Sequence, residues 1–193
     1  CIAGALLAEN VLQYRYFSDL RPEILTSCCA TIFGEGAGGL GADLASWPVR
    51  ESRITFFAAV SLALIAGLRS LRDSRALALF SAITLLLGGI SVAAVITWIA
   101  PGFYELPTHH CPFCLLSSEY GYVGYLLYGL LLLGVVAGAG SGLLHNLRAI
   151  DPWDSIEPGR EGRLCITSMV AFGLFVAIAV WPMVASDFRM EGY

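Results

Sequence analysis

Apolar residues gather into five long runs along the chain, and polar segments separate these runs. A helix of about 20 apolar residues spans the hydrocarbon core of a bilayer, so we expect each run to form a transmembrane helix. The sequence therefore predicts an all-α integral membrane protein, a single helical domain over residues 1–193 that is embedded in a lipid bilayer. The five predicted helices cover residues 1–17, 50–68, 76–100, 115–144 and 164–185.

The first apolar run is short, because Arg15 interrupts it after 14 residues. A complete membrane span needs about 20 residues. We therefore expect the first helix to be truncated at its start, so that the sequence begins inside it.

The overall composition agrees with a membrane location. Hydrophobic residues make up 57% of the chain and charged residues 13%, whereas a soluble domain carries about 25% charged residues. The mean hydropathy is +0.73. The net charge of −4 argues against nucleic-acid binding, which depends on a basic surface.

With five spans, the polar segments alternate between the two sides of the membrane. Segments 18–53 and 101–114 then share one side, and segments 69–75 and 145–163 share the other. Short arginine-rich loops favour the cytoplasmic side, and segment 69–75 carries three arginines. We therefore expect a bacterial inner-membrane protein in which segments 18–53 and 101–114 face the periplasm.

Four of the six cysteines form two pairs in the segments that we place in the periplasm. Cys28 and Cys29 are adjacent, and Cys111 and Cys114 form a C-x-x-C immediately before the predicted fourth helix. Unpaired N–H groups at a helix start favour a thiolate, so this position favours a reactive thiol. Paired cysteines also suit the oxidising conditions outside the cytoplasm.

Two cysteine pairs on one side of a membrane are the minimum for a disulfide relay. One pair would exchange with an extracytoplasmic thiol protein, by attack of a thiolate on a disulfide sulfur. The other pair would pass two electrons to a quinone in the membrane. We therefore take Cys28, Cys29, Cys111 and Cys114 as the candidate catalytic residues of a membrane thiol–disulfide oxidoreductase.

The start of the predicted fourth helix is rich in tyrosine and also carries Glu119. On a helix, residues 118, 122 and 125 share one face. The tyrosines can form an aromatic belt at the membrane interface, or they can line a pocket for the aromatic ring head group of a quinone. The second alternative makes Glu119, Tyr122 and Tyr125 candidate cofactor-binding residues.

The segment Cys111-Pro112-Phe113-Cys114-Leu115 resembles the C-x-x-C motif of bacterial vitamin K epoxide reductase homologues. The order of elements is also similar: a first helix, an outer loop with two cysteines, two helices, a C-x-x-C that opens the fourth helix, and a fifth helix. The resemblance implies that Cys111 and Cys114 lie beside a bound quinone. It also implies that Cys28 and Cys29 shuttle electrons from a thioredoxin-like partner protein.

Two features of the chain differ from that family's pattern. The family's loop cysteines are several residues apart, whereas Cys28 and Cys29 are adjacent. A disulfide between neighbours is strained and easily reduced, and one of the two can instead pair with Cys111. No fused thioredoxin-like domain follows the predicted fifth helix, so we expect the partner protein to be a separate chain.

Two other functions fit the same cysteines. One is the binding or transfer of a soft metal ion, Cu or Zn, by thiolate and imidazole ligands. The other is a structural role, as an accessory subunit of a larger membrane complex whose disulfides only link the outer loops. A metal site uses its histidines as ligands, whereas a relay needs at most their charge. The candidate metal ligands are Cys28, Cys29, His109, His110, Cys111 and Cys114.

Overall fold

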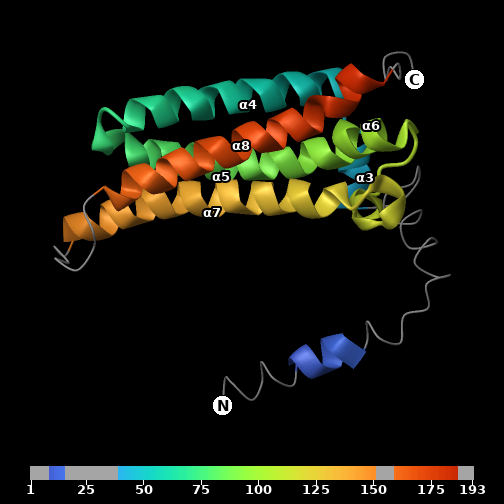
Figure 1. The fold of residues 1–193 in the computed structure, drawn as a ribbon, viewed down its shortest axis with the longest axis horizontal. Helices are drawn as coiled ribbons and strands as arrows, with labels where there is room; N and C mark the ends of the chain where they lie inside the picture. The colour runs from blue at the N-terminus through green and yellow to red at the C-terminus, as the bar shows by residue number, and fades with distance from the viewer. Residues whose placement is uncertain (1–8, 16–38, 151–158, 187–193) are drawn as a thin grey trace.

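A computed structural model of the protein describes residues 9–15, 39–150 and 159–186 (Figure 1). All regular secondary structure in these ranges is helical, so the predicted all-α class is confirmed. Residues 9–15 are helical, and the rest of the predicted first helix, residues 1–17, lies outside the described ranges. The count of five membrane helices therefore stays a prediction.

Four helical segments in the described part of the chain are long and apolar enough to cross a membrane. The mean hydropathy of their most apolar windows lies between 1.5 and 2.3. In order along the chain they match the second to fifth predicted helices. The segments are Val49–Ser70, Ser74–Tyr104, Val123–Leu147 and Arg160–Ala185.

These segments contain four long helices, which lie side by side in one bundle (Figure 1). Helix α7 packs against α5 and α8, and α4 packs against the same two helices. Large apolar side chains such as Leu86 and Val184 point out of the bundle and are 68% and 78% exposed. A bilayer accommodates such an exterior without the cost of hydrating it. The bounds are Val49–Ser70 for α4, Leu77–Ala94 for α5, Val123–Ile150 for α7 and Arg160–Ala185 for α8.

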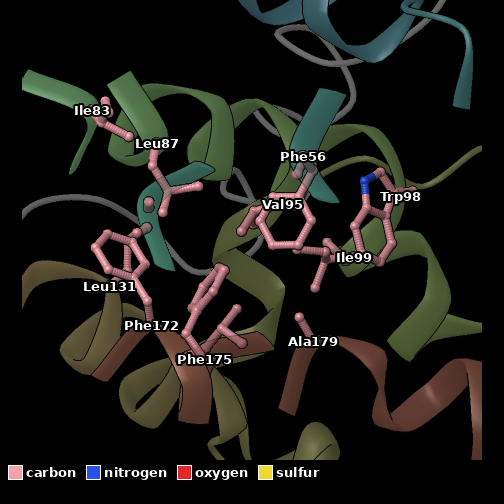
Figure 2. Packing of buried hydrophobic residues seen from close by; sticks show 14 of the residues in the cluster. Phe56, Ile83, Leu87, Val95, Trp98, Ile99, Leu131, Phe172, Phe175 and Ala179 are labelled. Atoms are coloured by element: carbon pink, nitrogen blue, oxygen red, sulfur yellow. The ribbon is translucent and has the colours of Figure 1, made fainter. Parts of the chain in front are cut away.

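Buried apolar side chains from all four long helices fill the interior of the bundle (Figure 2). Phe56 of α4 meets Trp98 edge to face, with ring centroids 5.6 Å apart, and lies 6.2 Å from the ring of Phe175 in α8. Ring pairs of this kind add about 0.5–1.5 kcal/mol beyond the burial of their surface. They pack α4 against α8 and against the segment that follows α5.

The predicted helix 76–100 continues further than expected. After α5 the chain forms one π-helical turn, η2 (Val95–Ile99), and then a short helix, α6 (Ala100–Tyr104). Pro101 lies at the start of α6, where its missing N–H interrupts the regular hydrogen-bond ladder. Glu105 then ends α6 with a φ of 54°, the left-handed conformation that often terminates a helix.

The fourth long helix begins later than predicted. Helix α7 starts at Val123, and two 3₁₀ turns precede it, η3 (Pro112–Leu116) and η4 (Ser118–Tyr120). Gly121 and Tyr122 have φ values of 60° and 57°, which a continuous right-handed helix does not permit. The prediction of a long helix that starts at residue 115, directly after the C-x-x-C, is therefore wrong.

The described part of segment 18–53 lies at the same end of the bundle as the connection between α6 and α7 (Figure 1). Helix α3 (Leu40–Ala45) packs against η2, and the Thr97 Oγ1 lies 3.2 Å from the Leu44 carbonyl oxygen. This arrangement agrees with the prediction that segments 18–53 and 101–114 share a side. The other cysteine pair, at positions 28 and 29, lies outside the described residues.

Three glycines spaced four residues apart let the neighbours of α7 approach it closely: Gly134, Gly138 and Gly142. A Cβ atom on Gly138 would lie 2.5 Å from the Oγ1 of Thr84 in α5 and 2.8 Å from the Oγ of Ser168 in α8. The Ser168 hydroxyl donates a hydrogen bond of 2.7 Å to the Gly134 carbonyl. Small residues at this spacing are typical of helix packing in membranes, where close backbone contact replaces the hydrophobic effect.

Gly138→Ala should destabilise the bundle by about 1–3 kcal/mol, because the new methyl group overpacks the contact with α5 and α8. Thermal unfolding of the purified protein in detergent measures this change. Gly129→Ala in the same helix is the matched control, since a Cβ there meets nothing within 4 Å. Equal unfolding temperatures for the two variants would contradict the close packing at Gly138.

Candidate functional site

The C-x-x-C lies in the connection between α6 and α7, at one end of the bundle (Figure 1). Cys111 precedes η3 and is 1% exposed, whereas Cys114 lies within η3 and is half-buried. The two thiols are not joined to each other in a disulfide. The next residue, Leu115, is fully buried, and a Cβ on Gly124 would lie 2.9 Å from its carbonyl oxygen. The missing side chain at Gly124 therefore lets η3 rest directly on the first turn of α7.

Two tyrosine hydroxyls hold the backbone of the C-x-x-C. The Tyr104 hydroxyl, at the end of α6, donates to the Cys111 carbonyl at 2.7 Å. The Tyr128 hydroxyl, in the second turn of α7, donates to the Pro112 carbonyl. A hydrogen bond of this kind contributes about 0.5–1.5 kcal/mol. The two tyrosines therefore tie two successive carbonyls of the motif to two different helices.

His110 supplies a third attachment for this connection. Its Nδ1 lies 3.0 Å from the Ile96 carbonyl oxygen, and because a carbonyl only accepts, Nδ1 carries the proton. The π-turn explains why this carbonyl is available. The Ala100 N–H donates to Val95, five residues back, and the corresponding donor for Ile96 would be Pro101, which has no N–H.

His109 lies beside the second thiol of the motif. Its Nε2 is 3.4 Å from the Cys114 Sγ, which is hydrogen-bonding distance for sulfur. An edge-to-face contact with Tyr104, whose ring centroid is 4.9 Å away, sets the orientation of the imidazole. An imidazole next to a thiol can take its proton and stabilise the thiolate, the species that attacks disulfides. The sequence suggested thiol activation by a helix N-terminus, whereas the structure places an imidazole beside the Cys114 thiol.

Tyr104, Tyr120 and Tyr128 all lie close enough to the Cys114 thiol to interact with it electrostatically. The rings of Tyr104 and Tyr120 are in contact, with centroids 4.6 Å apart. Burial raises the pKa of Tyr120, and the charges of Glu119 and Cys114 raise it further, so its hydroxyl stays protonated at neutral pH. None of the three tyrosines is among the site residues predicted from the sequence, because their approach to the thiols depends on η3, η4 and α6.

The predicted quinone-binding residues lie on the surface near the start of α7. Tyr122 and Tyr125 are 56% and 65% exposed, and their ring centroids are 6.2 Å apart. Tyr122 precedes α7, so the shared helical face predicted for residues 118, 122 and 125 does not form. Glu119 is exposed in η4. The role of these side chains in quinone binding stays a prediction.

The metal-site alternative depends on cysteines that the structure does not describe. Within residues 9–15, 39–150 and 159–186, no three His, Cys, Asp or Glu side chains are grouped so that they could hold a metal ion. Cys28 and Cys29, which the four-sulfur site requires, lie outside these ranges. Binding of copper or zinc by these residues therefore stays a prediction.

Comparisons with known proteins find no matching family model, no matching curated protein and no matching solved structure. The resemblance to bacterial vitamin K epoxide reductase homologues therefore remains a prediction from the motif. Function is inferred from the geometry of the site.

Tyr128→Phe removes one hydrogen-bond donor from the C-x-x-C backbone, the hydroxyl that bonds the Pro112 carbonyl. We expect a loss of about 0.5–1.5 kcal/mol in stability and faster alkylation of the buried Cys111, because the connection opens more easily. Alkylation of the reduced protein, followed by mass spectrometry of the Cys111 peptide, measures the rate. Tyr125→Phe is the matched control in the same helix, since its ring is 65% exposed. An unchanged rate in Tyr128→Phe would show that this hydroxyl does not hold the motif.

Proposed function

We propose that this protein is a membrane thiol–disulfide oxidoreductase, which relays electrons between an extracytoplasmic thiol protein and a membrane quinone through Cys111 and Cys114. The observation that carries the proposal is the 3.4 Å contact between the His109 imidazole and the Cys114 thiol. It occurs in a motif whose backbone is fixed by Tyr104 and Tyr128. A permanently closed structural disulfide needs no imidazole beside its sulfur.

The chemistry consists of two half-reactions that share the C-x-x-C. In the first, the dithiol of the partner protein becomes a disulfide while the Cys111–Cys114 disulfide becomes a dithiol. In the second, that dithiol is oxidised back to a disulfide, and its two electrons and two protons reduce a quinone to a hydroquinone. Each half-reaction can also run in reverse, so the same site serves either direction of electron flow.

The bundle supports the membrane part of the proposal. The C-x-x-C connection lies at one end of the bundle of four apolar helices, so we expect its thiols near the edge of the hydrocarbon layer. Tyr122 and Tyr125 expose more than half of their surface beside this connection. Aromatic faces of this kind suit stacking with the ring of a quinone, and Glu119 adds a polar group next to them.

The remaining parts of the proposal come from the sequence. Cys28 and Cys29 would pass electrons between the C-x-x-C and a thioredoxin-like partner on the periplasmic side of a bacterial inner membrane, alongside direct exchange at the C-x-x-C itself. The arginine-rich loop at residues 69–75 would then face the cytoplasm.

Cys111→Ser and Cys114→Ser should each abolish quinone-dependent oxidation of dithiothreitol by the protein in lipid vesicles, because neither variant can close the C-x-x-C disulfide. The loss of quinone absorbance, corrected for vesicles without protein, measures the rate. Cys165→Ala is the matched control, since this buried thiol lies 3.7 Å from the Gly67 carbonyl in another part of the bundle. Full activity in either serine variant would end the relay proposal.

A further inference from the structure

The two thiols of the C-x-x-C have different surroundings. Cys111 is 1% exposed, and its carbonyl is bonded to Tyr104, whereas Cys114 is half-buried and follows Phe113, which is 63% exposed. We propose that Cys114 forms the mixed disulfide with a partner's cysteine and that His109 takes and returns the proton of this thiol. The nature of the partner, a protein disulfide or dithiol, rests on the proposed function.

Access to the two sulfurs favours Cys114 as the exchanging thiol. Disulfide exchange requires an incoming sulfur to reach its target sulfur directly. The buried Cys111 is covered within the connection that Tyr104 and Tyr128 hold in place. Cys111 is therefore suited to the second step, in which it attacks Cys114 from inside the motif.

Of the described histidines, His109 is the one placed to serve Cys114. The Nδ1 of His110 is bonded to the Ile96 carbonyl, and His145 borders a different cavity, lined also by Arg72 and Gly159. The ring of His109 packs against Tyr104, which keeps its Nε2 at 3.4 Å from the sulfur. A cysteine paired with an imidazole in this way is a common form of activated nucleophile.

Among the described titratable groups around this pair, the imidazole is the one suited to act as the base for the Cys114 thiol. Tyr104, Tyr120 and Tyr128 face Cys114 from α6, η4 and α7, and phenols are ordinarily neutral at pH 7. Cys111 is the other thiol of the motif, and the exposed Glu119 acts on Tyr120. The proton of Cys114 is therefore transferred to His109.

In the reducing direction, the Cys114 S–H gives its proton to the His109 Nε2, and the thiolate attacks one sulfur of the partner's disulfide. The partner's S–S bond breaks, a mixed disulfide forms at Cys114, and the departing partner sulfur receives the proton from His109. Cys111 then attacks the Cys114 sulfur, and its proton ends on the second partner sulfur. The partner leaves as a dithiol, and the motif closes as a disulfide. The oxidising direction runs the same steps in reverse.

Limited alkylation of the reduced wild-type protein with iodoacetamide tests the assignment of Cys114 without any substitution. At pH 7, peptide mapping should show Cys114 labelled at least about tenfold faster than Cys111, because it combines access with an activating imidazole. Equal labelling, or faster labelling of Cys111, would overturn the assignment.

His109→Gln tests the proton transfer. The labelling rate of Cys114 at pH 7 should fall about tenfold, and it should recover above about pH 8.5, where an ordinary thiol ionises unaided. His145→Gln, which changes a histidine away from the C-x-x-C, should label as the wild type does. Identical pH profiles for His109→Gln and the wild type would refute the role of His109.

Alkylation requires neither quinone nor partner protein, so its outcome is separable from the proposed function. If Cys114 labels as expected but quinone-dependent dithiol oxidation is absent, the relay is refuted while the reactive pair stands. If that oxidation is present but labelling does not depend on His109, the relay stands while the role of His109 is refuted.

Discussion

Backbone polar groups inside an apolar bundle must find their hydrogen-bond partners within the protein, and the C-x-x-C connection depends on this constraint. Tyr104 and Tyr128 donate to two successive carbonyls of the motif. His110 donates to the Ile96 carbonyl, for which the π-turn and the following proline provide no helical donor. These three bonds hold an irregular segment on the end of the bundle, and the ring of Tyr104 also orients His109.

The same attachments make the two thiols unequal. Fixing the carbonyls of Cys111 and Pro112 keeps the first sulfur inside the connection, while η3 carries Cys114 to a half-buried position beside an imidazole. A dithiol that exchanges with a partner benefits from this division, because one sulfur must be reached from outside and the other must attack it from within. In the proposed relay, the side chains that hold the C-x-x-C connection in place therefore also set which of its thiols can react with a partner.

Hydropathy alone predicted four of the long helices, because a run of apolar residues of this length has few other stable conformations in a bilayer. It did not predict the start of α7, since residues 115–122 are apolar and aromatic enough to extend the helix. The left-handed backbone conformation of Gly121 and Tyr122 prevents a continuous helix there, so α7 begins at the next residue. Tyr104 was missed because the sequence placed it in a polar loop, whereas the π-turn carries the helix on to include it. The C-x-x-C itself was evident from its spacing.

The central claim is that Cys111 and Cys114 interconvert between a dithiol and a disulfide in exchange with a quinone. Counting free thiols on the purified protein tests it most directly, before and after mild reductant and then after a short-chain quinone, with metal content measured on the same sample. If the relay operates, both thiols should appear on mild reduction, disappear with quinone, and carry no stoichiometric metal. Thiols that respond to neither reagent, or a copper or zinc ion bound stoichiometrically and lost in Cys111→Ser, would contradict it.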